Sequence, residues 1–406
     1  MNNMKKPKIR FKGFTDDWEQ RKLGEMGQTY TGLSGKAKDD FGHGQARFVT
    51  YMNVFSNPIS NPEMTEPIEI DPKQNEVEVG DVFFTTSSET PEEVGMSSIL
   101  LEKRGKTYLN SFCFGFRPSE KIDSYYLAYM LRSESTRAKI ILLAQGISRY
   151  NISKNKVMEI AVSLPSLDEQ KMIGQYFSQL DNLITLHQRK YEKLQIIKKS
   201  MLENCFPKNG EKVPKIRFFG FTGDWEQRKV GEVIEDYVEK TTVQNQYPVL
   251  TSSQQQGIVL QEDYFADRQV TTNDNVGYYV LPRGYFTYRS RSDTDLFVFN
   301  RNNLIDKGII SYYYPVFRPK NVDSNFLLRR LNNGIRSQVS MAAEGTGQHV
   351  LAHSKLKSME FLVPSVPEQK LIGAYFEILD HLITLHQSEL EKLQKIKKSL
   401  LERMFV

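Results

Sequence analysis

Apolar residues recur at alternating steps of four and three along two long stretches of this chain, which is the heptad spacing of paired α-helices. The first stretch places on one seam Ile173, Phe177, Leu180, Ile184, His187, Tyr191, Leu194, Lys198 and Met201, and the second places on another Ile372, Phe376, Leu379, Ile383, His386, Leu390, Leu393, Lys397 and Leu400. Charged residues such as Glu192 and Lys193 lie off the seam. The pattern predicts two long helices that pair with each other, antiparallel about a pseudo-twofold axis.

Both helices belong to a sequence repeat. The segment from Leu164 to Phe206 recurs from Val363 to Phe405, at a constant shift of 199 residues. A second segment, beginning PKIRF, starts at Pro7 and again at Pro214, a shift of 207 residues. The chain is therefore a tandem duplication whose middle segments have diverged in length and sequence. Variable segments between repeated segments suggest interchangeable recognition domains on a common scaffold.

Each predicted helix is long and has a plausible start signal. Ser166 with Glu169, and Ser365 with Glu368, have the spacing of a capping box. A continuous helix from Asp168 to Glu203 would be about 54 Å long. Since successive major-groove half-sites are about 34–36 Å apart, such a rod could hold two reading domains over separated stretches of DNA. A plain oligomerisation coil is the alternative.

The two middle segments mix the periodicities of helices and strands. Strand-like runs at Val77–Thr86 and Tyr278–Tyr288 alternate with helical stretches at Tyr125–Leu143 and Ser324–Val339. Both segments also contain a Phe-Arg-Pro motif followed by Asp, at Phe116 and Phe317. We therefore expect an α+β fold with two similar globular domains of mixed α/β content. These are residues 1–163 and 207–362, and the long helices are residues 164–206 and 363–406.

The composition of the chain limits the number of domains, the kinds of cysteine site and the cellular compartment that we expect. The chain has 406 residues, which is more than a single core usually supports. Its two cysteines, Cys113 and Cys205, occupy non-equivalent positions, so neither a disulfide framework nor a four-ligand zinc site is expected. No apolar run approaches the roughly 20 residues that span a bilayer, and the N-terminal residues lack the apolar core of a signal peptide. We expect a cytoplasmic protein with no membrane contact.

The net charge of +5 does not by itself identify a nucleic-acid partner, because binding depends on where the cations cluster. Six basic residues stand against one acidic residue between positions 132 and 156, and arginines are interleaved with aromatic and hydroxyl residues between positions 283 and 301. Arginine is the commonest bidentate partner of guanine. The candidate DNA-binding residues are Lys36, Lys38, Arg47, Arg137, Lys139, Ser148, Arg149, Tyr150, Asn151, Arg283, Tyr288, Arg289, Arg291, Arg301, Gln348 and His349. For each residue alone, a solvated surface role is the alternative.

Enzyme motifs are absent. Gly32 to Lys36 lacks the spacing of a phosphate-binding loop, and no dinucleotide fingerprint or Asn/Asp-Pro-Pro-aromatic run of amino-group DNA methylation occurs. Asp168-Glu169-Gln170-Lys171 is similar to the acidic motif of metal nucleases, but Pro367 replaces Asp168 in the second copy. The histidines show no metal-ligand spacing. We expect a non-catalytic binding module with no cofactor.

Four motifs in order resemble one known family over the whole chain. Trp18 to Glu25 and Trp225 to Glu232 share W-x-x-[RK]-[KR]-[LV]-G-E, and Glu169 to Gly174 and Glu368 to Gly373 share EQ-x-x-I-G. This arrangement resembles the specificity subunit (HsdS) of type I restriction-modification enzymes. The resemblance implies that each variable segment is a target recognition domain for one half of a bipartite site on double-stranded DNA. It also implies that the helices set the unread gap and dock two methyltransferase (modification) subunits and, through them, restriction subunits.

Two other functions remain open from the sequence. The first is a duplicated structural adapter that binds proteins or peptides through its globular domains. The second is a fused nuclease or methyltransferase. DNA affinity that falls steeply with salt would favour the specificity subunit over the adapter, because phosphate contacts release counterions. Turnover by the isolated chain would favour the enzyme.

Overall fold

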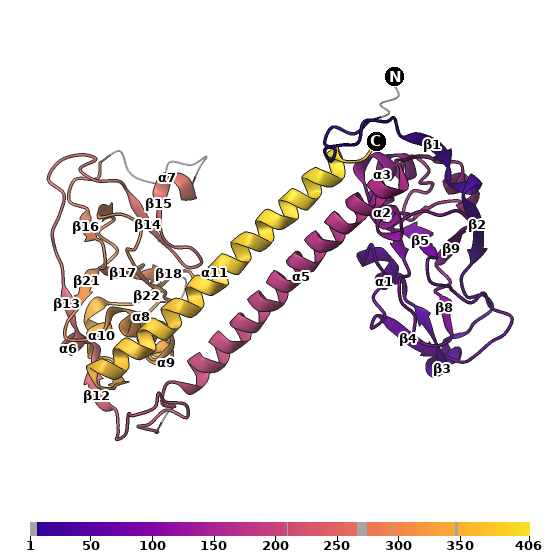
Figure 1. Cartoon of the computed structure of the whole chain (residues 1–406). Coiled ribbons are helices and arrows are strands. Elements are labelled where there is room, and N and C mark those ends of the chain that lie inside the picture. Colours follow the sequence, from indigo (N-terminus) through magenta and orange to yellow (C-terminus); the bar gives the residue numbers. More distant parts are fainter. Residues whose placement is uncertain (1–5, 209, 266–273, 295, 346–347) are drawn as a thin grey trace. The chain divides into compact units, whose positions relative to one another are not determined.

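The computed structural model describes residues 6–208, 210–265, 274–294, 296–345 and 348–406. The chain divides into two compact units. Unit 1 contains residues 1–189 and 387–406, and unit 2 contains residues 190–386. Each unit therefore takes one part of each long helix, α5 (Leu167–Asn204) and α11 (Val366–Arg403), which are the two longest ribbons in Figure 1.

Unit 1 is built on a four-stranded antiparallel sheet in the order β2-β9-β5-β7. Its strands are β1 (Glu19–Lys22), β2 (Gly27–Thr31), β3 (Phe41–Val49), β4 (Thr65–Ile68), β5 (Val82–Thr85), β6 (Ser87–Ser88), β7 (Ser97–Ile99), β8 (Thr107–Leu109), β9 (Cys113–Pro118), β10 (Tyr150–Asn151) and β11 (Ala161–Leu164). Besides α5 its helices are α1 (Tyr51–Ser56), α2 (Ser124–Met130), α3 (Glu134–Ile141) and α4 (Lys154–Met158), with 3₁₀ turns at Leu23–Glu25, Lys38–Asp40 and Pro91–Glu93. A second sheet, β4-β3-β8, covers its own apolar cluster.

Unit 2 repeats this plan with the sheet order β13-β21-β17-β19. Its strands are β12 (Glu226–Lys229), β13 (Ile234–Asp236), β14 (Leu250–Ser253), β15 (Gly257–Leu260), β16 (Tyr279–Pro282), β17 (Phe286–Tyr288), β18 (Arg291–Ser292), β19 (Phe299–Arg301), β20 (Lys307–Ile310), β21 (Val316–Pro319), β22 (His349–Val350) and β23 (Glu360–Val363). Besides α11 its helices are α6 (Val230–Val233), α7 (Gln261–Tyr264), α8 (Ser324–Asn333), α9 (Arg336–Ala342) and α10 (His353–Ser358). The predicted fold class, two similar α+β domains and two long helices, is confirmed.

The helix seams are where the heptads predict them. In unit 1, Lys397 of α11 pairs with Asp181 of α5 at 2.5 Å, and Phe405 lies 5.6 Å from the ring of Phe177. Phe405, which follows α11 and comes after Lys397, contacts Phe177, which comes before Asp181, so the two segments are antiparallel. In unit 2 the equivalent pair is Lys198 with Asp380, at 2.7 Å. The lysines at the predicted seam positions therefore form ion pairs between the two helices.

The end of the chain is part of the core of unit 1. Phe405 packs against Tyr126 and Phe177, and the amide of Ile9 donates to the carbonyl oxygen of Arg403. Figure 1 shows the C-terminus beside α2. Unit 2 has the same contacts from a continuous stretch of chain, in which Phe206 stacks on Phe376.

Candidate nucleic-acid interface

The duplicated EQ-x-x-I-G motif joins each long helix to its globular part. In unit 1 the Glu169 carboxylate accepts two hydrogen bonds from Arg10, at 2.7 and 2.8 Å. Gln170 accepts from the amide of Asp123 at 3.0 Å and donates to the Pro165 carbonyl at 2.9 Å. A Cβ at Gly174 would lie 2.6 Å from the amide nitrogen of Tyr126, so only glycine allows α2 to approach so closely.

Unit 2 repeats these contacts. Glu368 accepts from Arg217 at 2.7 and 2.8 Å, and Gln369 accepts from the amide of Asp323 at 2.9 Å. A Cβ at Gly373 would lie 2.5 Å from the Asp323 carboxylate. The predicted capping box is half correct, because the Ser166 hydroxyl does accept from the amide of Glu169, at 3.4 Å. The Glu169 carboxylate, however, binds Arg10 and not the start of the helix. The motif therefore has a structural role.

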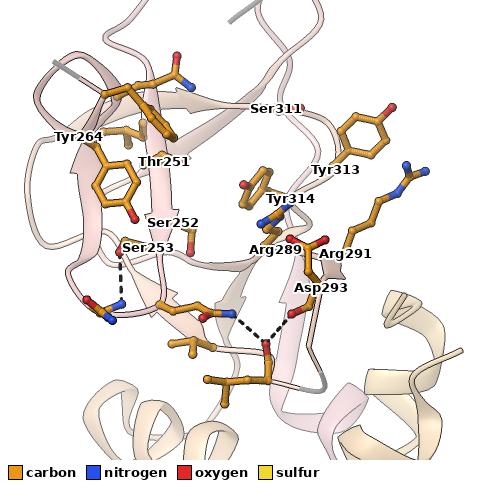
Figure 2. A pocket seen from close by; sticks show the side chains of 18 of the residues that line it. Thr251, Ser252, Ser253, Tyr264, Arg289, Arg291, Asp293, Ser311, Tyr313 and Tyr314 are labelled. Carbon is orange, nitrogen blue, oxygen red and sulfur yellow. Dashed lines mark hydrogen bonds between the residues drawn. The ribbon is translucent and has the colours of Figure 1, made fainter. Parts of the chain in front are cut away.

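Unit 2 contains a polar cavity of about 770 Å³. Its walls come from β14, from α7, from the segment that begins with β18 and from residues 311–314. Figure 2 shows tyrosine, hydroxyl, carboxylate and guanidinium side chains around it. The labelled side chains are those of Thr251, Ser252, Ser253, Tyr264, Arg289, Arg291, Asp293, Ser311, Tyr313 and Tyr314. Such a lining offers both hydrogen-bond donors and acceptors to a ligand.

A short two-stranded ribbon borders this cavity, and its strand β18 lines it. Arg291 of β18 lies opposite Val350 of β22, and Ser292 lies opposite His349. The Arg291 guanidinium lies 4.5 Å from the ring centroid of Tyr313. Gln348 lines the same cavity. The fold thus brings together four of the predicted residues of unit 2, Arg289, Arg291, Gln348 and His349.

The equivalent ribbon in unit 1 borders a smaller cavity, of about 260 Å³. Tyr150 and Asn151 of β10 lie opposite Ser88 and Ser87 of β6, and Arg149 lines the cavity. Its other lining residues are Tyr51, Met52, Phe55, Ser87, Ser88, Glu89, Glu93 and Phe112. Ser148, Arg149 and Asn151 are exposed. The two units therefore carry cavities at equivalent ribbons with different side chains.

Several predicted residues of unit 1 are engaged within the fold. The Arg137 guanidinium donates to the carbonyl oxygens of Glu92, Val94 and Gly95, and burial lowers the pKa of Arg137 to about 10. Lys139 donates to the Ala161 carbonyl at 2.9 Å, and burial lowers the pKa of Lys139. These two cations hold α3 against neighbouring segments.

The remaining predicted residues of unit 1 lie away from its cavity. Lys36 pairs with Asp71 at 2.8 Å, and this contact lowers the pKa of the Asp71 carboxyl well below its usual range. Arg47 donates to the hydroxyl of Thr65 at 2.5 Å. Lys38 is exposed on its 3₁₀ turn.

In unit 2, three predicted residues also have partners within the fold. Tyr288 is buried and its hydroxyl donates to the Leu351 carbonyl at 3.2 Å, while burial raises its pKa. Arg283 pairs with Asp306 at 2.9 Å. Arg301 donates to Ser324 at 2.8 Å, and burial lowers its pKa.

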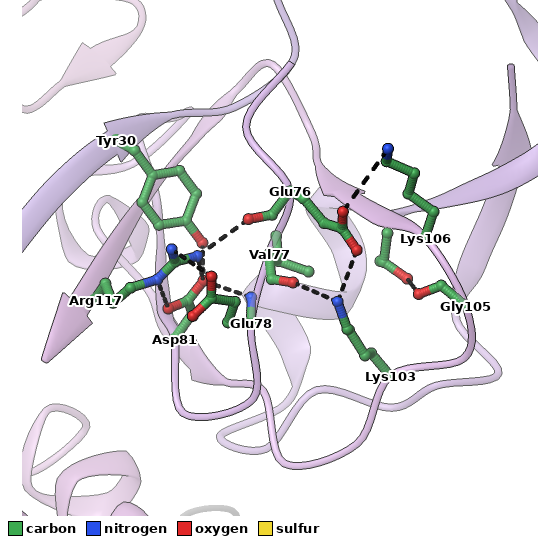
Figure 3. Close-up of polar contacts among 10 residues, drawn as sticks. Tyr30, Glu76, Val77, Glu78, Asp81, Lys103, Gly105, Lys106 and Arg117 are labelled. Atoms are coloured by element: carbon green, nitrogen blue, oxygen red, sulfur yellow. Dashed lines mark hydrogen bonds and ion pairs between the residues drawn. The ribbon is translucent and has the colours of Figure 1, made fainter. Parts of the chain in front are cut away.

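A polar network fixes the sheet of unit 1 (Figure 3). Arg117 of β9 donates to both oxygens of the buried Asp81, each at 2.8 Å, and to Glu78 at 2.8 Å. The Tyr30 hydroxyl of β2 donates to Asp81 at 2.5 Å, and burial together with the Asp81 charge raises the Tyr30 pKa. This network ties β2 and β9 to the turn that precedes β5.

In the described ranges, no group of three or more His, Cys, Asp or Glu residues could hold a metal ion. None of the helices in the described part of the chain combines the length and apolar character needed to cross a membrane.

The model of the type I restriction modification DNA specificity domain matches the chain twice, over residues 15–195 and 222–395. The chain belongs to this family. Each match begins just before a strand that pairs with the strand preceding the long helix of the same copy. These pairs are β1 with β11 and β12 with β23. The family domain therefore corresponds to one copy of the duplicated plan.

Named specificity subunits resemble the chain over most of its length. The MjaVIII type I restriction enzyme specificity subunit of Methanocaldococcus jannaschii is 25% identical, over 75% of this chain and 74% of that protein. A protein of the same organism that is assigned as an MjaX specificity subunit is 23% identical, over 95% of this chain and 92% of its own. The crystal structure of the type I restriction-modification S subunit from M. genitalium has the same fold, with a TM-score of 0.60 and 13% identity over 99% of both chains.

Sequence reasoning missed part of the specificity domain's cavity in unit 2. Tyr264, Asp293 and Tyr312 to Tyr314 line it, yet none was predicted to bind DNA. The run of three tyrosines was a usable signal, because tyrosine carries both a ring and a polar tip. In unit 1 the missed residue with the clearest chemistry is Glu89.

Proposed function

We propose that this chain is the DNA-recognition subunit of a type I restriction-modification complex and that each unit reads one half of a bipartite DNA site. The observation that carries the proposal is the doubled specificity domain, with a polar cavity at the same ribbon in each copy but with different linings. Base edges are read by donors and acceptors of this kind, and phosphates by cations.

The contact residues are assigned by their place at the two cavities. In unit 2 we assign to the interface Arg289, Arg291 and Gln348, which line the cavity, and His349 of the adjoining β22, and in unit 1 the loop from Ser148 to Asn151. Lys38 is a candidate phosphate contact because it is exposed. Arg137 and Tyr288 are better explained as structural residues, because their polar groups bind backbone carbonyls.

The long helices supply the rest of the function. A 38-residue helix is about 57 Å long, enough to set the unread gap between two half-sites. Each helix also exposes a narrow apolar stripe. On α5 it includes Met172, Leu183 and Leu186, and on α11 it includes Leu371, Ile378 and Leu385.

The two stripes support docking of two copies of one partner. Met172 and Leu371 are equivalent positions in the repeat, as are Leu186 and Leu385. Exposed apolar side chains of this kind mark protein contacts. We propose that each stripe docks one methyltransferase subunit, which in turn recruits restriction subunits. The complex would act in the cytoplasm.

The test is sequencing of methylated genomic DNA from cells that make this chain with its modification subunits. We expect methylation at a site with two half-sequences and a fixed gap. Exchanging residues 28–163 should change one half-sequence only. An exchange that alters both halves would contradict modular reading. A purified chain whose DNA affinity does not fall with salt would favour a protein-binding adapter.

A further inference from the structure

Two arginines at the cavity of unit 2 are exposed and form no ion pair with any described residue. Arg289 follows β17 and Arg291 begins β18, and neither has a carboxylate partner within the described ranges. Arg283 differs, because Asp306 occupies its guanidinium. A guanidinium without a partner keeps five N–H donors for a ligand.

Arg291 has an aromatic contact at the cavity. Its guanidinium lies 4.5 Å from the centroid of the Tyr313 ring, and the Tyr312 hydroxyl donates to that of Tyr313 at 3.2 Å. The next residue, Ser292, is buried and paired with β22. Stacking on an aromatic ring stabilises a guanidinium plane and reduces the ordering cost of binding. Arg291 is therefore held ready for a planar, bidentate acceptor.

The cavity is better suited to a base than to a phosphate. Asp293 lines it two residues after Arg291, and its carboxylate would repel a phosphate placed there. In the major groove, guanine presents two acceptors, N7 and O6, and its cytosine partner presents an amino donor. A G·C pair is thus the one pair that gives Arg291 a bidentate acceptor and offers a donor to Asp293.

The corresponding position in unit 1 has different chemistry. The amide of Leu351 donates to the carbonyl of Ser290 just as that of Ile152 donates to the carbonyl of Thr86. This match places Ser87 where unit 2 has Arg291. No guanine reader is therefore expected at this point of the other half-site.

We infer that Arg291 determines specificity for a guanine in the half-site read by unit 2. The inference rests on the proposed function and adds to it a base and the residue that reads it. Tyr313 is then a positioning residue, because it acts by holding Arg291.

The test uses the complex of the full chain with its modification subunits, bound to duplexes that carry each base pair at each position of the site. Arg291→Lys keeps the charge but loses the bidentate fork. We expect this variant to lose about tenfold or more of the preference for G·C at one position of the second half-site. Replacing that guanine with 7-deazaguanine, which lacks the N7 acceptor, should weaken binding of the unaltered complex more than binding of the variant.

Arg283→Lys is the matched control, since its guanidinium is paired and outside the cavity lining, and it should leave the preference unchanged. Unchanged discrimination at the first half-site shows that the Arg291 variant is folded. An even loss of affinity for all duplexes would identify a phosphate contact and overturn the inference, as would a second half-site without guanine. Absence of any sequence preference in the unaltered complex would instead overturn the proposed function.

Discussion

Glu169 and Glu368 show how one residue type connects helix and domain. Each carboxylate is about 1% exposed and each is held by one arginine, Arg10 or Arg217, that is 14% exposed. A buried pair contributes little relative to a well-packed apolar pair, but removing one partner leaves an uncompensated charge. The two pairs are therefore sensitive to substitution on one side only.

Glu169→Ala should lower the free energy of unfolding of unit 1 by about 3–5 kcal/mol, because Arg10 loses its partner. Glu368→Ala should do the same to unit 2. Urea unfolding followed by hydrogen exchange of each unit measures both effects. The double replacement Arg10→Met with Glu169→Leu should recover most of the loss. A single variant as stable as the parent chain would show that water compensates the arginine.

Asp236 of unit 2 forms ion pairs whose contribution to stability depends on pH. Burial alone would raise its pKa, but hydrogen bonds from Lys357 at 2.8 Å and His353 at 2.9 Å outweigh this and lower the pKa. A lowered folded-state pKa stabilises the fold above the unfolded value of about 3.9 and loses that contribution as pH falls through the folded value.

Asp236→Asn should therefore reduce stability near pH 7 by about 1 kcal/mol or less, because the carboxylate is partly exposed. The difference from the parent chain should shrink below about pH 4. Thermal unfolding between pH 3 and 8 measures it, with Glu235→Gln as a control on an exposed pair. A difference that stays constant with pH would rule out the charge as its cause.

At the level of elements, each long helix has a buried seam face and an exposed apolar stripe. The seam faces bury Ile173, Phe177 and Leu180 in α5, while the stripe with Leu186 stays exposed. Such separation of faces follows from the helical period, since residues seven or fourteen apart share one side.

Leu186→Glu and Leu385→Glu should each abolish docking of one modification subunit and leave the other. Placing a charge in an apolar contact costs several kcal/mol. Native mass spectrometry of the complex should then show one modification subunit per variant chain and, as we propose, two per parent chain. Ile196→Glu is the matched control, because Ile196 is exposed on α5 but lies off the stripe. Unchanged stoichiometry in both stripe variants would exclude this docking surface.

The sequence could reveal the helices because their signal is local and repeated over many turns. The seam positions are evident from spacing alone, and so is the duplication. The role of Arg137 was not predictable in this way, because the carbonyls of Glu92, Val94 and Gly95 that engage it belong to a distant segment. Tyr288 is similar, since its burial depends on packing against Phe299 and His353. Long-range packing decides which polar groups reach solvent.

At the scale of the whole molecule, each unit is completed by chain from the other repeat. Unit 1 needs the end of α11 and Phe405, which follows it, and unit 2 needs the end of α5 and Phe206, which follows it. Neither domain has a complete core from its own repeat. We expect the long helices and the two globular domains to fold as interdependent parts.

The most direct test of the account is the dependence of the gap on helix length. Seven residues inserted after His187 and seven after His386 keep the heptad seam in register. They add about 10.5 Å to each helix, which corresponds to at most about three base pairs of duplex. Sequencing of methylated DNA should show both half-sequences unchanged and a longer gap between them. An unchanged gap, or a change in either half-sequence, would contradict the account.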